Sequence, residues 1–276
     1  MTDTPVYREH LPPPELRDVV RCAWELTGDA EAGDFEPIVP DGCPELVFNL
    51  ADPYRRRSRT GAHLQPRAMV VGQTTEAAWV GPSGVSTLVG LRLHPWGGPI
   101  LFGVPMSELI DAFVPGAEVL GRWVDDVHHH MGELPPPRRI DALFEAVHRR
   151  LAGRAGTSIP LARSVVRRIA SSGGRVSVRA LARAYGTSER TLQRLLHRDV
   201  GLAPSTLVRI VRVQDALGRM LARPEVPLGR LALDAGYYDQ AHFTREFRRV
   251  VGCTPTDFLN GAPGLTSHFV PESGEP

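Results

Sequence analysis

The sequence predicts an α+β fold with a β-rich N-terminal half and an all-α C-terminal half. Three observations support this: short β-branched and apolar segments early in the chain, a helix-turn-helix pattern that occurs twice near its end, and a division of charge between the halves. Residues 161–260 hold 17 arginines and 8 acidic residues, a net charge of +9, whereas residues 1–160 carry −6. A length of 276 residues is typical of two domains that each have a core.

The composition indicates where these domains begin and end. Glycine and small polar residues replace the apolar periodicity after residue 152. We therefore expect one domain over residues 1–152, a linker over 153–160, a second, basic domain over 161–260 and a disordered tail over 261–276.

Strands are expected first, and helices follow them. Alternating β-branched and apolar residues predict strands at residues 45–50, 67–71, 77–80 and 86–93. The arginine-rich segment 54–60 is interpreted as a solvated loop. Apolar residues at helical spacing predict helices over residues 106–113, 117–131 and 138–151, the last pair being separated by three prolines.

The C-terminal half contains an internal repeat, which is a strong indicator of architecture. Leu181, Ala182 and Gly186 recur fifty residues later as Leu231, Ala232 and Gly236. After a one-residue insertion the offset becomes fifty-one, and the matching residues are then Phe243 for Leu192, Arg245 for Arg194, Phe247 for Leu196, Val251-Gly252 for Val200-Gly201 and Pro255 for Pro204.

Each copy has the local signals of a helix-turn-helix. Ser177 and Ser188 are suited to cap the two helices of the first copy, and Gly186 supplies the left-handed residue between them. Pro227 opens the first helix of the second copy and Gly236 closes it. A long helix over residues 204–223 is expected to join the copies.

The polar residues of each second helix are candidates for base contacts, because Arg and Gln make bidentate contacts in the major groove. The alternative is two ordinary helical hairpins with solvated faces, and two copies in register favour the DNA-binding interpretation. The candidate DNA-binding residues are Ser188, Glu189, Arg190, Gln193, Arg194, Asp239, Gln240, Ala241, His242, Thr244 and Arg245.

At these residues the sequence resembles the AraC family of bacterial transcription regulators. The resemblance covers roughly residues 161–259 and is strongest at Leu181-Ala182, Ser188-Glu189-Arg190-Thr191-Leu192-Gln193-Arg194, Ala235-Gly236-Tyr237, Asp239-Gln240-Ala241-His242-Phe243-Thr244-Arg245-Glu246-Phe247-Arg248 and Gly252-Cys253-Thr254-Pro255. It implies seven helices, with two recognition helices entering successive major grooves of promoter DNA. It also implies activation through RNA polymerase.

The N-terminal half resembles an uncharacterised domain found before AraC-type readers, through Pro40 to Phe48, Val71-Gly72-Gln73 and Gly90 to Gly98. The resemblance implies a regulatory domain without naming a ligand. Polar and aromatic residues near strand ends often line ligand pockets on β scaffolds. A structural turn cluster is the alternative to a ligand site formed by Asp41, Glu45, Gln73, Arg92, His94 and Trp96.

No metal or cofactor is expected. The cysteines, Cys22, Cys43 and Cys253, share no metal-ligand spacing and are interpreted as reduced thiols, although pairing or oxidant sensing by Cys22 and Cys43 stays open. His128, His129 and His130 are adjacent on a predicted helix, where successive residues point about 100° apart and cannot converge on one ion. The pairs Asp125 with His129 and Asp126 with His130 could share a site, but a solvated face is favoured.

The N-terminus has no signal-peptide pattern and no apolar run is long enough to span a bilayer, so we expect a protein of the bacterial cytoplasm that joins the nucleoid when bound to DNA, with no membrane partner.

Three functional classes follow from these observations. The first is a sequence-specific transcription regulator, expected to be an activator, whose N-terminal domain senses a small molecule. The second is a ligand-independent regulator whose N-terminal domain is an interaction module, for example for homodimerisation. The third, an enzyme fused to a DNA reader, is disfavoured because no nucleophile, carboxylate pair or phosphate loop has supporting spacing.

Overall fold

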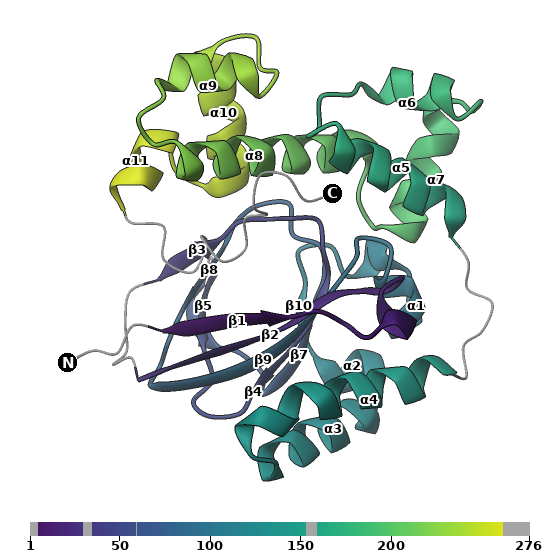
Figure 1. Cartoon of the computed structure of the whole chain (residues 1–276), viewed down its shortest axis with the longest axis vertical. Coiled ribbons are helices and arrows are strands. Elements are labelled where there is room, and N and C mark those ends of the chain that lie inside the picture. Colours follow the sequence, from purple (N-terminus) through teal and green to yellow (C-terminus); the bar gives the residue numbers. More distant parts are fainter. Residues whose placement is uncertain (1–4, 30–34, 59, 153–158, 262–276) are drawn as a thin grey trace. The chain divides into compact units, whose positions relative to one another are not determined.

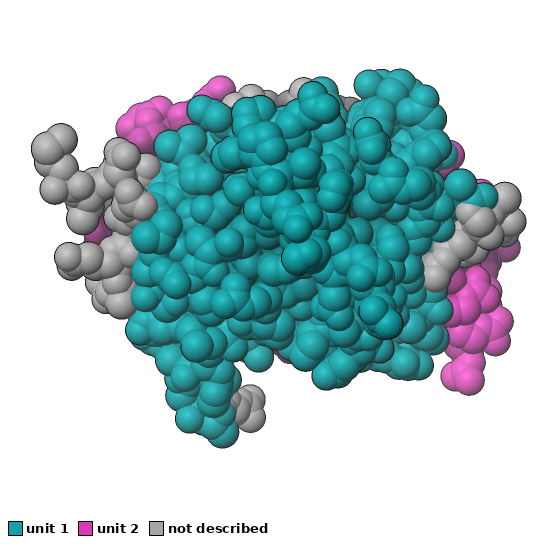
Figure 2. Space-filling view, turned by 90° about the horizontal axis from the view of Figure 1, so that it is seen from below, with its two compact units in different colours: residues 1–35, 43–73, 79–159 teal, residues 36–42, 74–78, 160–276 magenta. Residues whose placement is uncertain are grey.

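The computed structural model describes residues 5–29, 35–58, 60–152 and 159–261, which form two compact units (Figures 1 and 2). The first unit comprises residues 1–35, 43–73 and 79–159, and the second comprises residues 36–42, 74–78 and 160–276. Two short segments of the N-terminal half thus group with the C-terminal helices. Residues 153–158 and 262–276, where we expect most of the linker and the tail, lie outside the described residues.

The first unit is built on a six-stranded sheet in the order β1-β2-β9-β4-β7-β10, and the pairings described within it are antiparallel. The strands are β1 (Val6–His10), β2 (Val20–Asp29), β4 (Glu45–Asn49), β7 (Ala68–Val71), β9 (Val85–Leu93) and β10 (Phe113–Pro115). The strands predicted at residues 45–50, 67–71 and 86–93 are confirmed. The sequence analysis did not predict β1 and β2.

Helices cover one face of this sheet (Figure 1). They are α1 (Gly98–Phe102), α2 (Gly116–Leu120), α3 (Arg122–Glu133) and α4 (Arg139–Ala152), with short 3-10 turns at Pro14–Leu16, Met106–Glu108 and Pro136–Arg138. Leu46, Leu91 and Val70 of the sheet pack with Val124 of α3 and Leu143 of α4 in a common core. Because side chains alternate along a strand, the strand residues next to Leu46, Val70 and Leu91 project from the opposite face of the sheet.

A smaller sheet has the order β3-β8-β5-β6 and corrects one prediction. Its strands are β3 (Glu36–Ile38), β5 (Arg55–Ser58), β6 (Gly61–Leu64) and β8 (Ala78–Gly81). The strand expected at residues 77–80 is confirmed, but the loop expected at residues 54–60 contains β5. The guanidinium groups of Arg55 and Arg57 lie over the Phe35 ring at 5.1 and 4.6 Å, and such aromatic contacts let arginines occupy a strand.

Two predicted helices differ from the structure. Residues 106–113 form only the 3-10 turn Met106–Glu108, after which the chain joins the sheet edge as β10. Asp111 N donates to Gln73 O and Gly72 N donates to Ala112 O, so sheet pairing outweighs the helical apolar spacing there. The helix predicted over residues 117–131 is divided into α2 and α3 at Gly121, whose φ of +64° interrupts helical geometry. The helix expected at residues 138–151 is confirmed as α4.

The second unit contains the seven helices that the resemblance implied, counted over residues 159–261. They are α5 (Pro160–Ser171), α6 (Val178–Ala184), α7 (Glu189–Asp199), α8 (Pro204–Ala222), α9 (Leu228–Asp234), α10 (Gln240–Val251) and α11 (Pro255–Asn260). The long joining helix is α8, and it runs between the α6–α7 and α9–α10 motifs (Figure 1).

The core of the second unit takes in a residue from the N-terminal half of the sequence. Val39 is only 2% exposed and packs in one cluster with Val213 and Leu217 of α8. The Gln214 side-chain amide donates to Pro40 O at 2.8 Å and to Val39 O at 3.4 Å. Sequence periodicity could not indicate this, because the contact joins residues about 175 positions apart.

Candidate nucleic-acid interface

The two helix-turn-helix motifs repeat each other in backbone detail. Helices α6 and α9 each have seven residues and begin fifty positions apart, and α7 and α10 begin fifty-one positions apart. Thr187 N donates to Ala182 O in the first turn, and Tyr237 N donates to Ala232 O in the second. The glycine in each turn is left-handed, with φ of +60° at Gly186 and +81° at Gly236. The repeat predicted from the sequence is therefore a repeat in structure.

Side-chain oxygen atoms cap both second helices. Ser188 Oγ accepts a hydrogen bond from Thr191 N at 3.1 Å, and Asp239 Oδ1 accepts one from His242 N at 2.6 Å. Each cap satisfies one free N–H of the first turn. Ser177 caps α6 in the same way, through Ala180 N at 3.1 Å.

Helix α7 presents an exposed polar face. Leu192 and Leu196 are buried, and the outward residues are Glu189, Arg190, Gln193 and Arg194, all exposed. This arrangement leaves two arginines and one glutamine on adjacent turns, and these are the side chains that read guanine and adenine edges.

Helix α10 presents a face of different composition. Phe243 and Phe247 are buried, Gln240, Ala241 and Arg245 are exposed, and His242 and Thr244 are half-buried. The rings of His242 and Tyr237 make an edge-to-face contact with centroids 5.5 Å apart. Part of the His242 ring is therefore in contact with the turn between α9 and α10. The second face has one exposed arginine among the predicted residues, where the first has two.

The structure adds basic residues that the sequence analysis did not include. Arg179 and Arg183 are exposed on α6, whereas the positions fifty residues later in α9 are Gly229 and the 57% exposed Leu233. On α9, Arg230 pairs with Asp234 at 3.1 Å. The repeat in the sequence contains this difference in charge, because Arg179 and Arg183 align with the uncharged residues Gly229 and Leu233.

An ion pair attaches the second recognition helix to α8. Arg209 Nε lies 2.7 Å from Glu246 Oε2, and both side chains are about a quarter exposed. Glu246 is thereby directed toward α8 and away from the polar face of α10.

In the first unit, Arg92 and Glu45 are two of the six candidate ligand residues, and the structure joins them by an ion pair. They are directly opposite each other on β9 and β4, and Arg92 Nε donates to Glu45 Oε1 at 2.7 Å. Arg92 is only 3% exposed. A buried guanidinium needs carboxylate partners, because removing an unpaired charge from water is costly.

Four further strand residues share this sheet face with Arg92 and Glu45. Cys22 is opposite Arg92 on β2, Glu9 Oε1 lies 3.4 Å from Arg92 Nη1, and Tyr7 Oη donates to the same Glu9 oxygen at 2.6 Å. Trp24 lies over Gly90, where a Cβ would overlap its ring, and stacks with Tyr7 at 6.0 Å. We call Tyr7, Glu9, Cys22, Trp24, Glu45 and Arg92 the Arg92 face.

Burial keeps two side chains of the Arg92 face, Cys22 and Tyr7, in their neutral forms. Burial raises the pKa of the Cys22 thiol to about 12, and Arg92 opposes that rise. Burial also raises the pKa of Tyr7 above its ordinary value. Both groups are therefore neutral at pH 7, and the other polar residues of the face are Arg92, Glu9 and Glu45.

The other candidate ligand residues lie elsewhere. Gln73 is fully buried and donates to Pro95 O at 3.1 Å. His94 stacks on Trp96 with centroids 4.6 Å apart, and the Trp96 indole N–H donates to Asp18 O at 2.8 Å. Asp41 lies in the segment that belongs to the second unit. The structure thus divides the six candidates into a charged pair, a turn cluster and a separate residue.

The Arg92 face contains residues that the sequence analysis missed, because it did not predict β1 and β2. The signal was the two-residue spacing of Tyr7 and Glu9 and of Cys22 and Trp24, because residues two positions apart in a strand lie on the same face. Their meeting with Arg92 depends on strand register, which local sequence does not specify.

Within the described ranges, no group of three or more His, Cys, Asp or Glu residues could hold a metal ion. His128 Nε2 is 2.9 Å from Asn49 O, and His129 pairs with Glu133 at 3.3 Å, so these neighbours face different surroundings. Among the same residues, no helix is long and apolar enough to cross a membrane.

Comparison with known families matches both halves of the chain. Residues 181–261 match a helix-turn-helix domain model, and residues 8–115 match a domain of unknown function. The first match confirms the helix-turn-helix domain, and the second confirms an uncharacterised N-terminal domain before it.

Curated relatives match over less than a third of this chain. The HTH-type transcriptional activator RhaS of Escherichia coli strain SE11 is 32% identical over 86 residues, which are 31% of this chain and 31% of that protein. RhaS of Escherichia coli O157:H7 has the same identity and coverage. The match therefore spans about a third of the length of these relatives.

Solved structures give a broader but looser match. ToxT from Vibrio cholerae O395 aligns over 94% of this chain and 99% of its own, with 10% identity and a TM-score of 0.48. The C-terminal domain of AraT, a response regulator from Geobacillus stearothermophilus, aligns over 37% of this chain and 85% of its own, with 21% identity and a TM-score of 0.35. Both TM-scores are below 0.5, and no conclusion about this chain rests on them.

Proposed function

Because residues 181–261 form a helix-turn-helix domain of the AraC type, we propose that the chain is a transcription regulator that binds specific promoter sequences. The observation that carries the proposal is the duplication of an exposed polar face on a capped recognition helix. Helix α7 offers Arg190, Gln193 and Arg194, and α10 offers Gln240 and Arg245. A structural hairpin requires the buried leucines and phenylalanines but does not require these outward residues.

Charge supports the same proposal. Residues 161–260 carry a net charge of +9 in a chain whose total is +1. Arginines that neutralise DNA phosphates supply affinity that does not depend on sequence. Arg179 and Arg183, exposed on α6, are suited to that role beside the base-reading face of α7.

We further propose that the regulator acts as an activator that contacts RNA polymerase in the bacterial cytoplasm. The matched relatives are named transcriptional activators, and the helix-turn-helix domain model, which matches residues 181–261, spans both recognition helices. An enzymatic role has no support of this kind.

Regulation through the N-terminal domain is proposed in two forms. In the first, a small molecule binds at the Arg92 face, where one arginine and two glutamates lie beside stacked Tyr7 and Trp24 rings. In the second, the domain is an interaction or homodimerisation module without a ligand. The buried charge of Arg92 favours the first form, because a structural role alone would be served by apolar residues at lower desolvation cost.

A metabolite screen separates these two forms. A ligand that binds the folded protein raises its melting temperature with dose. The full chain and an Arg92→Met variant are compared in a thermal-shift screen. A dose-dependent rise in the wild type that the variant loses supports the ligand form, and a flat response in both supports the module form.

The main experiment is selection of binding sites from a random DNA library by the full chain, followed by hydroxyl-radical footprinting. Two recognition helices on one chain should protect two unlike half-sites about 10–10.5 base pairs apart. The matched control is Arg149→Ala, which removes an exposed arginine from α4 in the first unit and should leave selection unchanged. Protection of a single major-groove segment would contradict the two-reader proposal, and failure to enrich any sequence would contradict the function itself.

A further inference from the structure

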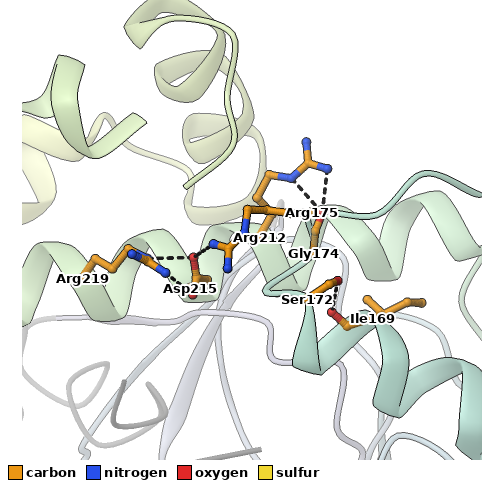
Figure 3. A network of polar contacts seen from close by, with 7 residues as sticks. All are labelled: Ile169, Ser172, Gly174, Arg175, Arg212, Asp215 and Arg219. Atoms are coloured by element: carbon orange, nitrogen blue, oxygen red, sulfur yellow. Dashed lines mark hydrogen bonds and ion pairs between the residues drawn. The ribbon is translucent and has the colours of Figure 1, made fainter. Parts of the chain in front are cut away.

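The turn between α5 and α6, which precedes the first helix-turn-helix motif, packs against the middle of α8. Arg212 donates to Gly174 O through Nε at 2.9 Å and through Nη2 at 2.6 Å (Figure 3). Gly174 has φ of +67°, and a Cβ there would meet Val208 O at 2.5 Å. No side chain other than hydrogen fits between this turn and the helix, so the turn has little freedom to move relative to α8.

The same arginine reaches the second helix-turn-helix. The Arg212 guanidinium lies 5.6 Å from the centre of the Tyr237 ring, which belongs to the turn between α9 and α10. Tyr237 is 4% exposed and packs in the core of the second unit with Leu217 of α8. Arg212 therefore contacts both the turn that precedes the first motif and the turn within the second.

A second link is centred on Asp215 of α8. Arg175 Nη1 lies 3.0 Å from Asp215 Oδ2, and Arg219 Nε and Nη2 lie 2.8 and 3.2 Å from the two oxygens of the same carboxylate (Figure 3). The aliphatic part of Arg175 lies against Gly236, where a Cβ would be 2.9 Å from Arg175 Cγ. Arg175 thus bridges the start of the first motif, the turn of the second and the helix between them.

We propose that Arg175 and Asp215 are positioning residues that fix the relative orientation of α7 and α10, and thereby set the half-site spacing that the chain accepts. The inference rests on the proposed DNA-binding function and deepens it. Helix α8 has 19 residues and is about 28 Å long, so a small rotation about its middle moves the recognition helices by a large fraction of a base-pair step. Arg175 precedes α6 and Asp215 lies in α8, so both are outside the two recognition helices and their proposed role is separate from base contact.

The first test measures spacing preference. The full chain and its Asp215→Asn and Arg175→Gln variants bind the selected site with the spacer between half-sites changed by −2 to +2 base pairs. We expect the preference of the wild type for its best spacing to fall by about threefold to tenfold in each variant. Asp215→Glu, which keeps the charge, should restore most of the preference. Glu145→Gln is the matched control, because it breaks an exposed pair with Arg149 that lies within α4 of the first unit.

Equal spacing profiles in wild type and variants would overturn the inference, as would an equal loss of affinity at every spacing. Melting temperatures of the variants identify a general loss of structure, which is also evidence against a positioning role.

A second test needs no DNA and keeps the inference separate from the proposed function. Cysteines replace the exposed His197 of α7 and Arg249 of α10 in a chain that carries Cys253→Ser, and spin labels report the distance between them. A distribution that broadens or shifts in Asp215→Asn supports the positioning role even if no DNA sequence is selected. An unchanged distribution contradicts it whatever the DNA result.

Discussion

Arg194 and Arg245 occupy matching positions in the repeat but have different neighbours. Arg194 is flanked on its face by Arg190 and Gln193, whereas Arg245 has Ala241 one turn before it. A bidentate base contact contributes about 1–3 kcal/mol of discrimination. We expect Arg194→Ala to abolish most of the selective binding and Arg245→Ala to weaken it less, in titrations of the selected site against scrambled DNA.

Both variants should keep the wild-type melting temperature, since both side chains are exposed. A wild-type ratio of specific to scrambled binding in Arg194→Ala would show that α7 does not read bases.

Cys22 provides a prediction about pH. Burial raises the pKa of its thiol from 9.0 to about 12, so the folded chain holds this proton more tightly than the unfolded chain. The resulting stability is complete below pH 9 and is lost as the pH rises toward 12. We expect Cys22→Ala to lose less unfolding free energy than the wild type between pH 8 and pH 10.5, measured by urea denaturation.

Tyr7 and Tyr237, whose pKa values burial also raises, are present in both proteins and do not affect this comparison. Parallel losses in the two chains would show that the thiol is accessible to water.

Residue-level signals in the sequence were reliable where they are local. Ser177 and Ser188 cap their helices as expected, because a cap depends on the next three residues. The pairing of Arg92 with Glu45 could not be predicted, because it depends on the register between β4 and β9. The base contacts of the candidate residues remain predictions at this scale.

The first helices of the two motifs differ in their exposed charge, which leads to a prediction for whole elements. Arg183 is exposed on α6, whereas Arg230 of α9 is paired with Asp234. Loss of one phosphate contact lowers the slope of log affinity against log salt concentration by about 1. We expect this reduction in Arg183→Ala and a smaller one in Arg230→Ala, from titrations at several salt concentrations.

Equal slopes for the two variants would indicate that α6 and α9 approach the DNA backbone alike.

Elements with strong periodicity were predicted well, and elements set by distant partners were not. Helices α4 and α8 follow their apolar spacing closely. Residues 106–113 have helical spacing, but the backbone of Gly72 and Gln73 offers sheet pairing to that segment. The arginines of β5 are polar enough to suggest a loop, and the rings of Phe35 and Phe113 that accommodate them lie far away in the sequence.

The division of the whole molecule leads to a prediction about truncation. A fragment of residues 153–276 contains both recognition helices and should bind the selected DNA. It lacks Val39, whose burial in the second core contributes roughly 1.5–3 kcal/mol. We therefore expect this fragment to bind the same sequence but to melt at a lower temperature than the second unit in the full chain.

Val39→Ala in the full chain is the matched control, because it removes the same contact without removing a domain. If the fragment does not fold at all, residues 36–42 and 74–78 are required parts of the DNA-binding unit.

The position of both readers on one helix also has a consequence for the cell. When one motif has docked, the other is held within about 28 Å of it by α8, so its local concentration no longer depends on the abundance of the protein. A regulator that must dimerise to read two half-sites responds to the square of its concentration at low abundance. On the proposed binding of two half-sites by one chain, occupancy follows the first power of concentration, so at low abundance each bipartite site is occupied in proportion to the number of chains present.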